Sequence, residues 1–340
     1  MATVAAGPAG PLNMNSLQIA NLQYGSVPVY DATLVRVDNG GGLVADFHGA
    51  FTYPAGGGSG GGGAYGYDYG YNYGGMAATG PDAYYPSAGT VTQVTELVNG
   101  QVSMDVTGVA ADAPTLFNAM RDRAMPVVFN ALFGGDDLIS GSPLNDWLDG
   151  YTGRDTVNGG DGADFIRALE DNDIVDAGGG DDDANGNTGS DIVHGGDGAD
   201  FVRGGRDADT VYGDAGDDFH VNGNIGDDMV FGGAGSDTLF GGQDQDQLFG
   251  EDGNDALSGD LGVDTLSGGP GADRFLIRAG AGADVAADFN AAEGDRVQVA
   301  PGQAFTLSVV GGQAVIDLGG GDSLTLMGVA QASPDWVVVA

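Results

Sequence analysis

Lysine and cysteine are absent from this 340-residue chain, and positive charge is scarce: 10 Arg stand against 49 Asp and Glu, a formal net charge of −39. Without Lys there is no Walker-type phosphate loop and no Schiff-base chemistry. Without Cys there is no disulfide framework, thiol nucleophile or thiolate metal site. The negative charge argues against DNA, RNA and anionic membranes as partners, because all of them would repel the chain. So acidic a chain needs bound cations to become compact.

Targeting and membrane segments are also missing from the pattern. The first 35 residues contain no basic residue and no continuous apolar run, so no N-terminal secretory signal is expected. No stretch approaches the ~20 apolar residues of a membrane span, and no membrane insertion is expected.

Catalytic motifs are not found either. There is no HExxH motif, and the three histidines, His48, His194 and His220, are too scattered to indicate a zinc site or a triad. The segment Gly57-Gly58-Ser59-Gly60-Gly61 fits GxSxG only formally, because it lies inside a glycine run. We therefore predict that the chain is not an enzyme.

The chain is rich in Gly, with 66 residues. Between residues 131 and 276 it also contains a regular repeat marked by Asp. Sixteen Asp residues recur every nine positions, with one extra residue after the tenth. They are Asp137, Asp146, Asp155, Asp164, Asp173, Asp182, Asp191, Asp200, Asp209, Asp218, Asp228, Asp237, Asp246, Asp255, Asp264 and Asp273. Internal periodicity of this kind outranks local propensity in deciding a fold.

Each repeat reads as a tight turn followed by a short strand. Glycines before the Asp permit positive φ, and an aliphatic residue two positions after it, such as Val193 or Leu239, would point inward. Two repeats make one coil of 18 residues. The prediction is an all-β fold, a parallel β-roll, with a small β-rich N-terminal domain and a β-strand C-terminal cap.

The turns predict a metal array. Carboxylates and backbone carbonyls in stacked flexible loops suit Ca²⁺ better than Mg²⁺ or a transition metal. We expect roughly 10–14 Ca²⁺ ions, held by every repeat Asp except Asp146 and Asp173, whose loops have lost glycines. About 14 ions would bring the charge from −39 to about −11. The alternative is a solvated, disordered acidic linker, but sixteen repeats in register have no reason to occur in one.

Some repeats depart from the pattern. Asp171, Asp207 and Asp244 stand at the fourth position, where Gly is expected. They are either extra ligands or tolerated turns, because Asp adopts the left-handed conformation more readily than most residues. The insertion near Phe219 predicts a bulge, and His220 is interpreted as a packed or surface residue rather than a ligand.

The unit GGxGxDxUx, as in Gly232-Gly233-Ala234-Gly235-Ser236-Asp237, resembles the RTX calcium-binding nonapeptide repeat. This resemblance implies a β-roll with Ca²⁺ between successive turns, and export by a type I apparatus that reads an uncleaved C-terminal signal. Gly271-Ala272-Asp273-Arg274-Phe275 is similar to the family's exit from the roll. Residues 277–340, ending in the apolar tail 336–340, would form the cap and carry the signal.

Large apolar residues also flank the inward positions of several strands, where polar residues are expected. The predicted interface residues on the roll are Trp147, Phe165, Phe201, Phe219, Phe231 and Phe249. Such an apolar row is too large to stay exposed on a monomer. Either a terminal region folds over it or it is a self-association interface, and the sequence leaves both open.

The N-terminal domain is expected over residues 1–130. Residues 43–53 alternate as a strand, 90–109 read as a hairpin turning at Asn99-Gly100, and a short helix is expected after Asp112. A Gly/Tyr-rich insertion spans 54–75. This insertion is either a flexible loop between strands or an interface segment that becomes ordered on contact with a neighbouring molecule or a surface. Its tyrosines are Tyr65, Tyr67, Tyr69, Tyr71 and Tyr73.

The functional prediction is a secreted calcium-binding structural protein of the extracellular space or cell surface. It would fold on extracellular Ca²⁺ and self-assemble into a surface layer, filament or matrix, with other copies or a cell-surface component as partner. The alternative is a monomeric secreted adhesin that recognises a glycan or surface.

Overall fold

The computed structural model describes residues 134–340 throughout and, before them, the backbone of six strands, β1–β6. It divides into two compact units. One unit comprises Met1–Ser142 and Trp147–Asp155, and the other Pro143–Asp146 and Thr156–Ala340. No helix in the described part of the chain is long and apolar enough to cross a membrane.

The described residues of the first unit form eight strands: β1 (Thr3–Ala6), β2 (Val29–Tyr30), β3 (Leu34–Asp38), β4 (Leu43–Thr52), β5 (Ala88–Val98), β6 (Gln101–Asp112), β7 (Leu138–Ser140) and β8 (Trp147–Asp149). Strands β3, β4, β5 and β6 pair antiparallel in chain order, and β1 joins β6 antiparallel and β7 in parallel. Strand β4 lies where a strand was expected at 43–53, and β5 and β6 flank the expected turn at Asn99-Gly100. The helix expected after Asp112 and the insertion at 54–75 lie outside the described residues.

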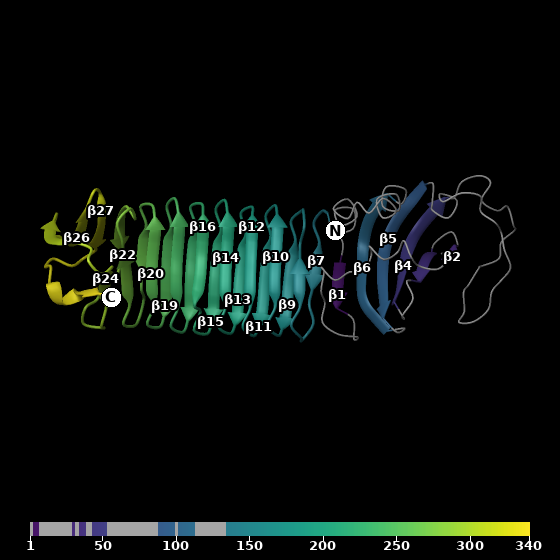
Figure 1. Cartoon of the computed structure of the whole chain (residues 1–340), viewed down its shortest axis with the longest axis horizontal. Helices are drawn as coiled ribbons and strands as arrows, with labels where there is room; N and C mark the ends of the chain where they lie inside the picture. Colours follow the sequence, from purple (N-terminus) through teal and green to yellow (C-terminus); the bar gives the residue numbers. More distant parts are fainter. Residues whose placement is uncertain are drawn as a thin grey trace. The chain divides into compact units, whose positions relative to one another are not determined.

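The second unit is built from two sheets of mostly parallel strands (Figure 1). The odd-strand sheet contains β9 (Thr156–Asp161), β11 (Ile174–Gly179), β13 (Ile192–Asp197), β15 (Thr210–Ala215), β17 (Met229–Ala234), β19 (Gln247–Asp252), β21 (Thr265–Ser267), β23 (Ala283–Ala286) and β27 (Asp322–Leu326). The even-strand sheet contains β10 (Phe165–Glu170), β12 (Asp183–Thr188), β14 (Phe201–Arg206), β16 (His220–Ile225), β18 (Thr238–Gln243), β20 (Ala256–Leu261), β22 (Arg274–Ile277), β24 (Arg296–Val299) and β28 (Val337–Val339). The predicted all-β parallel roll is confirmed.

Successive strands of one sheet are in register at a distance of 18 residues. Val175 pairs with Val193, which pairs with Val211 in the odd-strand sheet. This offset matches two nonapeptide repeats, so each coil contributes one strand to each sheet. Glycines make the turns between the sheets, as at Gly196 with φ of 106° and Gly198 with φ of 152°.

The core is one thin layer of inward aliphatic side chains between the two sheets. In the second unit every inward position predicted from the repeat is fully or almost fully buried, from Val157 through Leu266 and Phe275; Ile139 and Leu148 of the first unit are buried as well. Because strand side chains alternate, the residues on either side of each inward one face outward.

The C-terminal part closes the sheets with strands that also pair with the last coils. β27 joins β23, and β25 (Thr306–Val310) and β26 (Gln313–Gly319) extend it antiparallel. A 3₁₀ turn, η4 (Pro334–Trp336), leads into β28, which pairs with β24. Trp336 contacts Phe289 with a ring-centroid distance of 5.6 Å.

Candidate calcium-binding array

The repeat Asp residues all occupy the same place, at the end of a turn immediately before a strand. All sixteen are buried, from Asp137 to Asp273. The glycine-rich turn leads the chain around the edge of the roll. The side chain two positions after the Asp then points into the core. This places each carboxylate at the edge of the roll, under the turn of the neighbouring coil.

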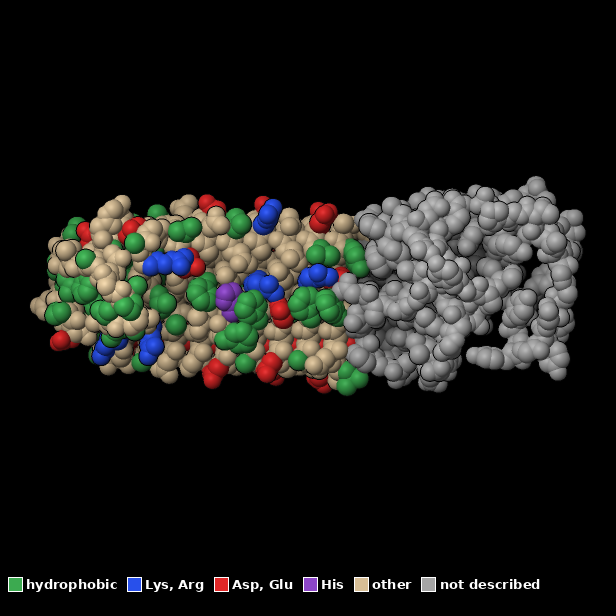
Figure 2. Space-filling model, viewed as in Figure 1, with side chains coloured by type: hydrophobic (Ala, Val, Ile, Leu, Met, Phe, Trp, Pro, Cys, Tyr) green, Lys and Arg blue, Asp and Glu red, His purple; other side chains and the backbone are tan. Residues whose placement is uncertain are grey.

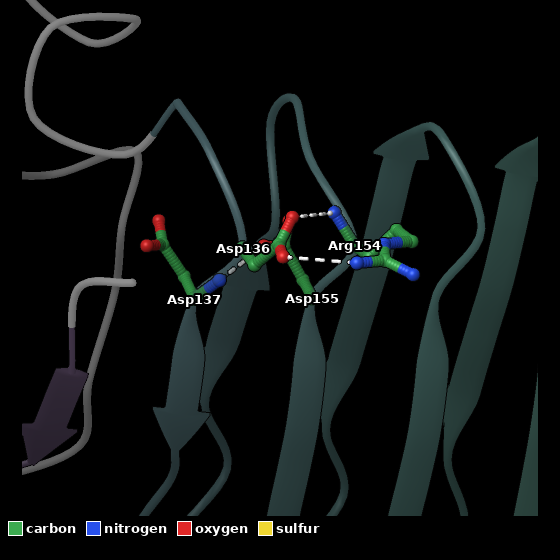
Figure 3. A network of polar contacts seen from close by, with 4 residues as sticks. All are labelled: Asp136, Asp137, Arg154 and Asp155. Atoms are coloured by element: carbon green, nitrogen blue, oxygen red, sulfur yellow. Dashed lines mark hydrogen bonds and ion pairs between the residues drawn. The ribbon is translucent and has the colours of Figure 1, made fainter.

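One oxygen of each carboxylate ties two coils together. Oδ1 of Asp200 accepts the backbone N–H of Asp182 at 2.8 Å, and Oδ1 of Asp218 accepts that of Asp200, also at 2.8 Å. Equivalent bonds of 2.6–3.1 Å run along both edges. Figure 3 shows the bond at the start of the array, from the N–H of Asp137 to Asp155 at 2.7 Å.

The same figure shows a second, exposed carboxylate beside this bond. Asp136 accepts the backbone N–H of Arg154 at 3.1 Å and pairs with its guanidinium at 3.3 Å (Figure 3). These contacts, with the backbone hydrogen bond as the largest cause, lower the pKa of Asp136. Exposed and paired, it differs from the buried repeat carboxylates.

The other oxygen, Oδ2, is the distinctive feature of the array. In twelve repeats it is buried and has no hydrogen-bond partner among the described residues: Asp164, Asp182, Asp191, Asp200, Asp209, Asp218, Asp228, Asp237, Asp246, Asp255, Asp264 and Asp273. A buried carboxylate oxygen without a partner is costly, and native proteins rarely leave one. A row of twelve indicates a ligand that the protein atoms do not supply.

The raised pKa values of these carboxyl groups also indicate a missing cation. Burial raises the pKa of Asp200 to about 6, against the lowering effect of the hydrogen bond from Asp182. For Asp209 and Asp246, burial and neighbouring carboxylates together raise the pKa to about 8. These carboxyl groups therefore hold their protons to a higher pH than free carboxyl groups do, and a bound cation would take the place of the proton.

The glycines show which other oxygens lie close to Oδ2. A Cβ added to Gly195 would lie 2.6 Å from Oδ2 of Asp200 and 2.8 Å from the carbonyl oxygen of Gly213 in the next coil. The same pairing of an Asp oxygen with a carbonyl oxygen recurs at Gly186, Gly213, Gly232, Gly241 and Gly250. The missing Cβ leaves room for a carboxylate and a carbonyl to approach one another.

This donor set fits calcium. It consists of oxygen alone, from carboxylates and backbone carbonyls, which is the set that Ca²⁺ prefers. No three His, Asp or Glu side chains in the described part of the chain gather around one point, so backbone carbonyls would have to supply much of the coordination. When bound, Ca²⁺ would supply the positive charge that the buried Oδ2 atoms lack.

Two repeat Asp residues were left out of the predicted ligand set, and the structure places them with the others. Asp146 and Asp173 are buried and donate their N–H groups to Asp164 and Asp191. The loop before Asp173 does differ: Ala168, fully buried, stands where most repeats have Gly.

The array also extends beyond the predicted repeats. Asp284 accepts the N–H of Asp264 at 3.1 Å, and burial raises its pKa to about 7. Asp295 accepts the N–H of Asp273 at 3.0 Å and, through its other oxygen, that of Asn290 at 2.7 Å. With both oxygens of Asp295 engaged, the array ends there on this edge. The sequence did contain a signal for these two residues, because each stands two positions before an aliphatic residue, as in the repeats.

The fourth-position residues are turn residues. Asp171, Asp207 and Asp244 have φ of 77°, 76° and 79°, the left-handed conformation of the glycines they replace. Nothing in their backbone geometry requires a ligand role.

The predicted interface residues fall on the outward surfaces of the strands, with one correction. Phe201 was expected to be followed one coil later by Phe219. Instead His220 pairs with Phe201, and their rings stack with centroids 4.1 Å apart. The inserted residue leaves Phe219 ahead of β16, 58% exposed and tilted against Phe201. Only this shift lets Val221 reach the core.

The remaining predicted interface residues lie as follows. Trp147 begins β8 and is 38% exposed, and Phe165 begins β10 half-buried. Phe231 and Phe249 stack with centroids 4.9 Å apart on the odd-strand sheet. The tyrosines at 65–73 lie outside the described residues.

Comparison with known proteins identifies the repeat. Residues 133–286 match the family model of the RTX calcium-binding nonapeptide repeat (4 copies), in the segments 133–166, 149–184, 159–193, 185–219, 222–257, 240–275 and 258–286. Repeats of this family bind Ca²⁺ and are typical of secreted proteins. No curated protein matches the chain.

Two solved structures are similar to parts of the chain. The AlgE6R3 subunit of the mannuronan C5-epimerase from Azotobacter vinelandii is 29% identical, with a TM-score of 0.29, over 34% of this chain and 78% of that one. The extracellular lipase LipA from Serratia marcescens is 19% identical, with a TM-score of 0.22, over 61% of this chain and 40% of that one. Both TM-scores are too low for either protein's activity to bear on this chain.

Proposed function

The chain is an RTX repeat protein over residues 133–286, and we propose that it is a secreted, non-enzymatic structural protein. It folds on extracellular Ca²⁺ and then self-assembles into a surface layer, filament or matrix. The observation that carries the calcium step is the row of twelve buried carboxylate oxygens without hydrogen-bond partners among the described residues.

Folding on calcium follows from the charge of the chain. At a net charge of −39 the compact state is opposed by its own repulsion, and the buried carboxylates add the cost of desolvation. Bound Ca²⁺ removes both penalties in the folded state only, so binding and folding are coupled. Weak extracellular sites bind Ca²⁺ at about 10⁻⁴–10⁻³ M. The chain would therefore stay unfolded where calcium is scarce and fold after export.

Self-assembly is supported by the outward surfaces of the roll. Several large apolar side chains on the strands stay exposed, such as Ile174 at 47%, Ile192 at 40% and Met229 at 37%. Stacked aromatic rings lie beside them. Contiguous apolar surface of this kind marks an interaction site on a soluble protein.

The first test titrates Ca²⁺ into the purified full chain, from chelator to about 10 mM, above the affinities of weak extracellular modules. Light scattering and negative-stain imaging follow assembly, and circular dichroism follows folding. The proposal expects β-structure to appear first and ordered filaments or sheets afterwards, with Mg²⁺ at equal concentration as the control. A compact monomer at saturating Ca²⁺ would contradict the assembly step, and a chain fully folded in chelator would contradict the calcium step.

A second candidate is a monomeric binding module for a glycan, and one feature favours it. The even-strand sheet has an open depression of about 420 Å³ lined by Asn185, Asn187, Arg203, Arg206, Asn224 and Gln243. Amide and guanidinium groups bind hydroxyl and carboxylate oxygens. On this alternative the calcium-loaded chain stays monomeric, binds an acidic oligosaccharide in calorimetry, and loses that binding on Arg206→Ala.

A further inference from the structure

The two sheets of the roll present outward surfaces with different charge. We name them the odd face, formed by the outward side chains of β9, β11, β13, β15, β17 and β19, and the even face, formed by those of β10, β12, β14, β16, β18 and β20. The six strands of the odd face carry no Arg, and one His on them, His194, contacts Asp214 at 2.8 Å. They carry six acidic residues: Asp161, Asp176, Asp197, Asp214, Glu251 and Asp252.

The even face holds all the positive charge of these twelve strands. Arg167, Arg203 and Arg206 lie on β10 and β14, and the same sheet has three acidic residues, so its strands are neutral in sum. Arg203 pairs with Asp183 and lies 4.6 Å from the ring centroid of Phe201. Arg206 is exposed and makes no ion pair within the described residues. Figure 2 shows Arg, hydrophobic and His side chains gathered along this face.

Both faces also carry a row of aromatic rings along the roll axis. On the odd face His194, Tyr212, Phe231 and Phe249 stack in sequence, with centroids 4.3, 4.8 and 4.9 Å apart. On the even face Phe201, His220 and Phe240 follow one another, at 4.1 and 4.9 Å. The two rows share one spacing because the same coils generate both.

We propose that the odd face of one copy packs against the even face of a second copy. This inference rests on the proposed self-assembly and names its contact. Odd face on odd face would oppose six acidic residues with six more. A contact between two even faces would leave the aromatic row of the odd face exposed in every copy. A contact between an odd face and an even face brings Arg167, Arg203 and Arg206 to the acidic residues of the odd face. It also covers both aromatic rows.

The consequence is an assembly that does not close on itself. The contact uses two different surfaces on opposite sides of the core, so a row of copies always keeps one free odd face at one end and one free even face at the other. Such a heterologous contact propagates as a row of rolls side by side. It requires Ca²⁺ only through the fold, because neither face includes the buried carboxylates.

The test uses two full-length variants, each with one face disabled. The odd-face variant carries Tyr212→Ser and Phe231→Ser, and the even-face variant carries Phe201→Ser and Arg203→Glu. Val310→Ser on β25 is the matched control, because Val310 is an apolar residue 64% exposed that belongs to neither face. Circular dichroism and bound-calcium measurements confirm that each variant folds.

Sedimentation velocity in saturating Ca²⁺ gives the readout. Each face variant alone is expected to sediment as a 34.0 kDa monomer, and the control to assemble like the unsubstituted chain. An equimolar mixture of the two variants is expected to form a dimer of twice that mass and nothing larger, since only one intact odd face and one intact even face remain to meet.

Each other outcome overturns the inference. If a single variant still dimerises alone, the contact is between like faces, and if the mixture stays monomeric, these faces are not the contact. In both cases the proposed function survives as long as the unsubstituted chain assembles. If the unsubstituted chain stays monomeric in Ca²⁺, the proposed function fails with the inference. Should a serine variant misfold, Arg203→Glu and Asp176→Arg form a charge-swap pair whose mixture must assemble better than Arg203→Glu alone.

Discussion

Oδ1 of Asp200 accepts the backbone N–H of Asp182, one coil earlier, at 2.8 Å, while its Oδ2 is buried without a hydrogen-bond partner among the described residues. The two oxygens of one carboxylate thus have different roles. The carboxylate holds two coils in register through one oxygen, and it presents the other to the space between turns.

The calcium-free roll should be more stable in acid than in base. Burial raises the pKa of the repeat carboxylates from 3.8 to about 6 for Asp200 and about 8 for Asp209. The folded state therefore binds more protons than the unfolded state between about pH 4 and about pH 8. Stability in the absence of calcium is fully present below about pH 4 and falls as the pH rises through this window.

Circular dichroism of the calcium-free chain between about pH 4 and about pH 9 would measure this difference, with β-structure expected at the acid end and its loss expected as the pH rises. Calcium reverses the sign, because the ion replaces the proton, so calcium affinity should rise across the same window. A β-structure content that increases with pH in the calcium-free chain would contradict the assignment of raised pKa values.

Asp200→Asn should separate the two roles of the carboxylate. The amide oxygen can still accept the N–H of Asp182, but the charge is lost. Fewer Ca²⁺ ions should bind per chain, and the calcium-free form should be more stable at alkaline pH because a buried charge has been removed. Elemental analysis of the dialysed protein counts the ions. Asp197→Asn, at an exposed carboxylate three residues earlier in the same turn, is the control and should leave the count unchanged.

Gly216→Ala should destabilise the roll far more than an ordinary glycine substitution. Gly216 has φ of 145°, and a Cβ there would lie 1.6 Å from the carbonyl oxygen of Gly198. The strained backbone alone costs about 1–3 kcal/mol, and the overlap with the backbone of the preceding coil adds to it. Gly302→Ala is the control: its φ is 82°, but a Cβ would meet nothing within 4 Å.

For Gly302→Ala we expect a loss of about 1–2 kcal/mol, the cost of the left-handed backbone alone. Urea unfolding in saturating Ca²⁺ compares the two variants. Equal losses would mean that close packing between coils contributes nothing at Gly216.

The nine-residue period was enough to predict the fold and the recurrence of an Asp at each turn. Each strand has only one inward side chain, so the spacing of Val193, Val202 and Val211 defines the sheets, the core and the turns at once. No long-range information is needed, because each coil contacts its neighbours in sequence order. The outward aromatic residues followed from the same alternation.

The failures occurred where the period breaks. An insertion before Val221 can be accommodated on either side of His220, and only core packing decides that Phe219 is displaced. Asp284 and Asp295 were missed because they follow their partners by 20 and 22 residues instead of 18. Their role is set by the three-dimensional stacking of coils, which a count along the sequence cannot show.

The last coil offers a final prediction, because a carboxylate closes it through hydrogen bonds to the backbone. Asp288 accepts the N–H of Gly268 at 3.0 Å and that of Gly269 at 2.9 Å, and it also accepts the hydroxyl of Ser267 at 2.6 Å. Asp288→Asn removes the charge and one of the two acceptor oxygens, which should cost about 1.5–3 kcal/mol, the value of hydrogen bonds to a charged group.

The loss should be local, because the bonds hold only the turn after β21. Hydrogen exchange in saturating Ca²⁺ should speed up at residues 267–269 while the amides of β13 and β15 stay protected. Asp252→Asn, at an exposed carboxylate on β19, controls for the change in net charge. Uniformly faster exchange along the whole roll would show instead that Asp288 is required for the fold of every coil, and unchanged exchange at 267–269 would show that these bonds do not hold the turn.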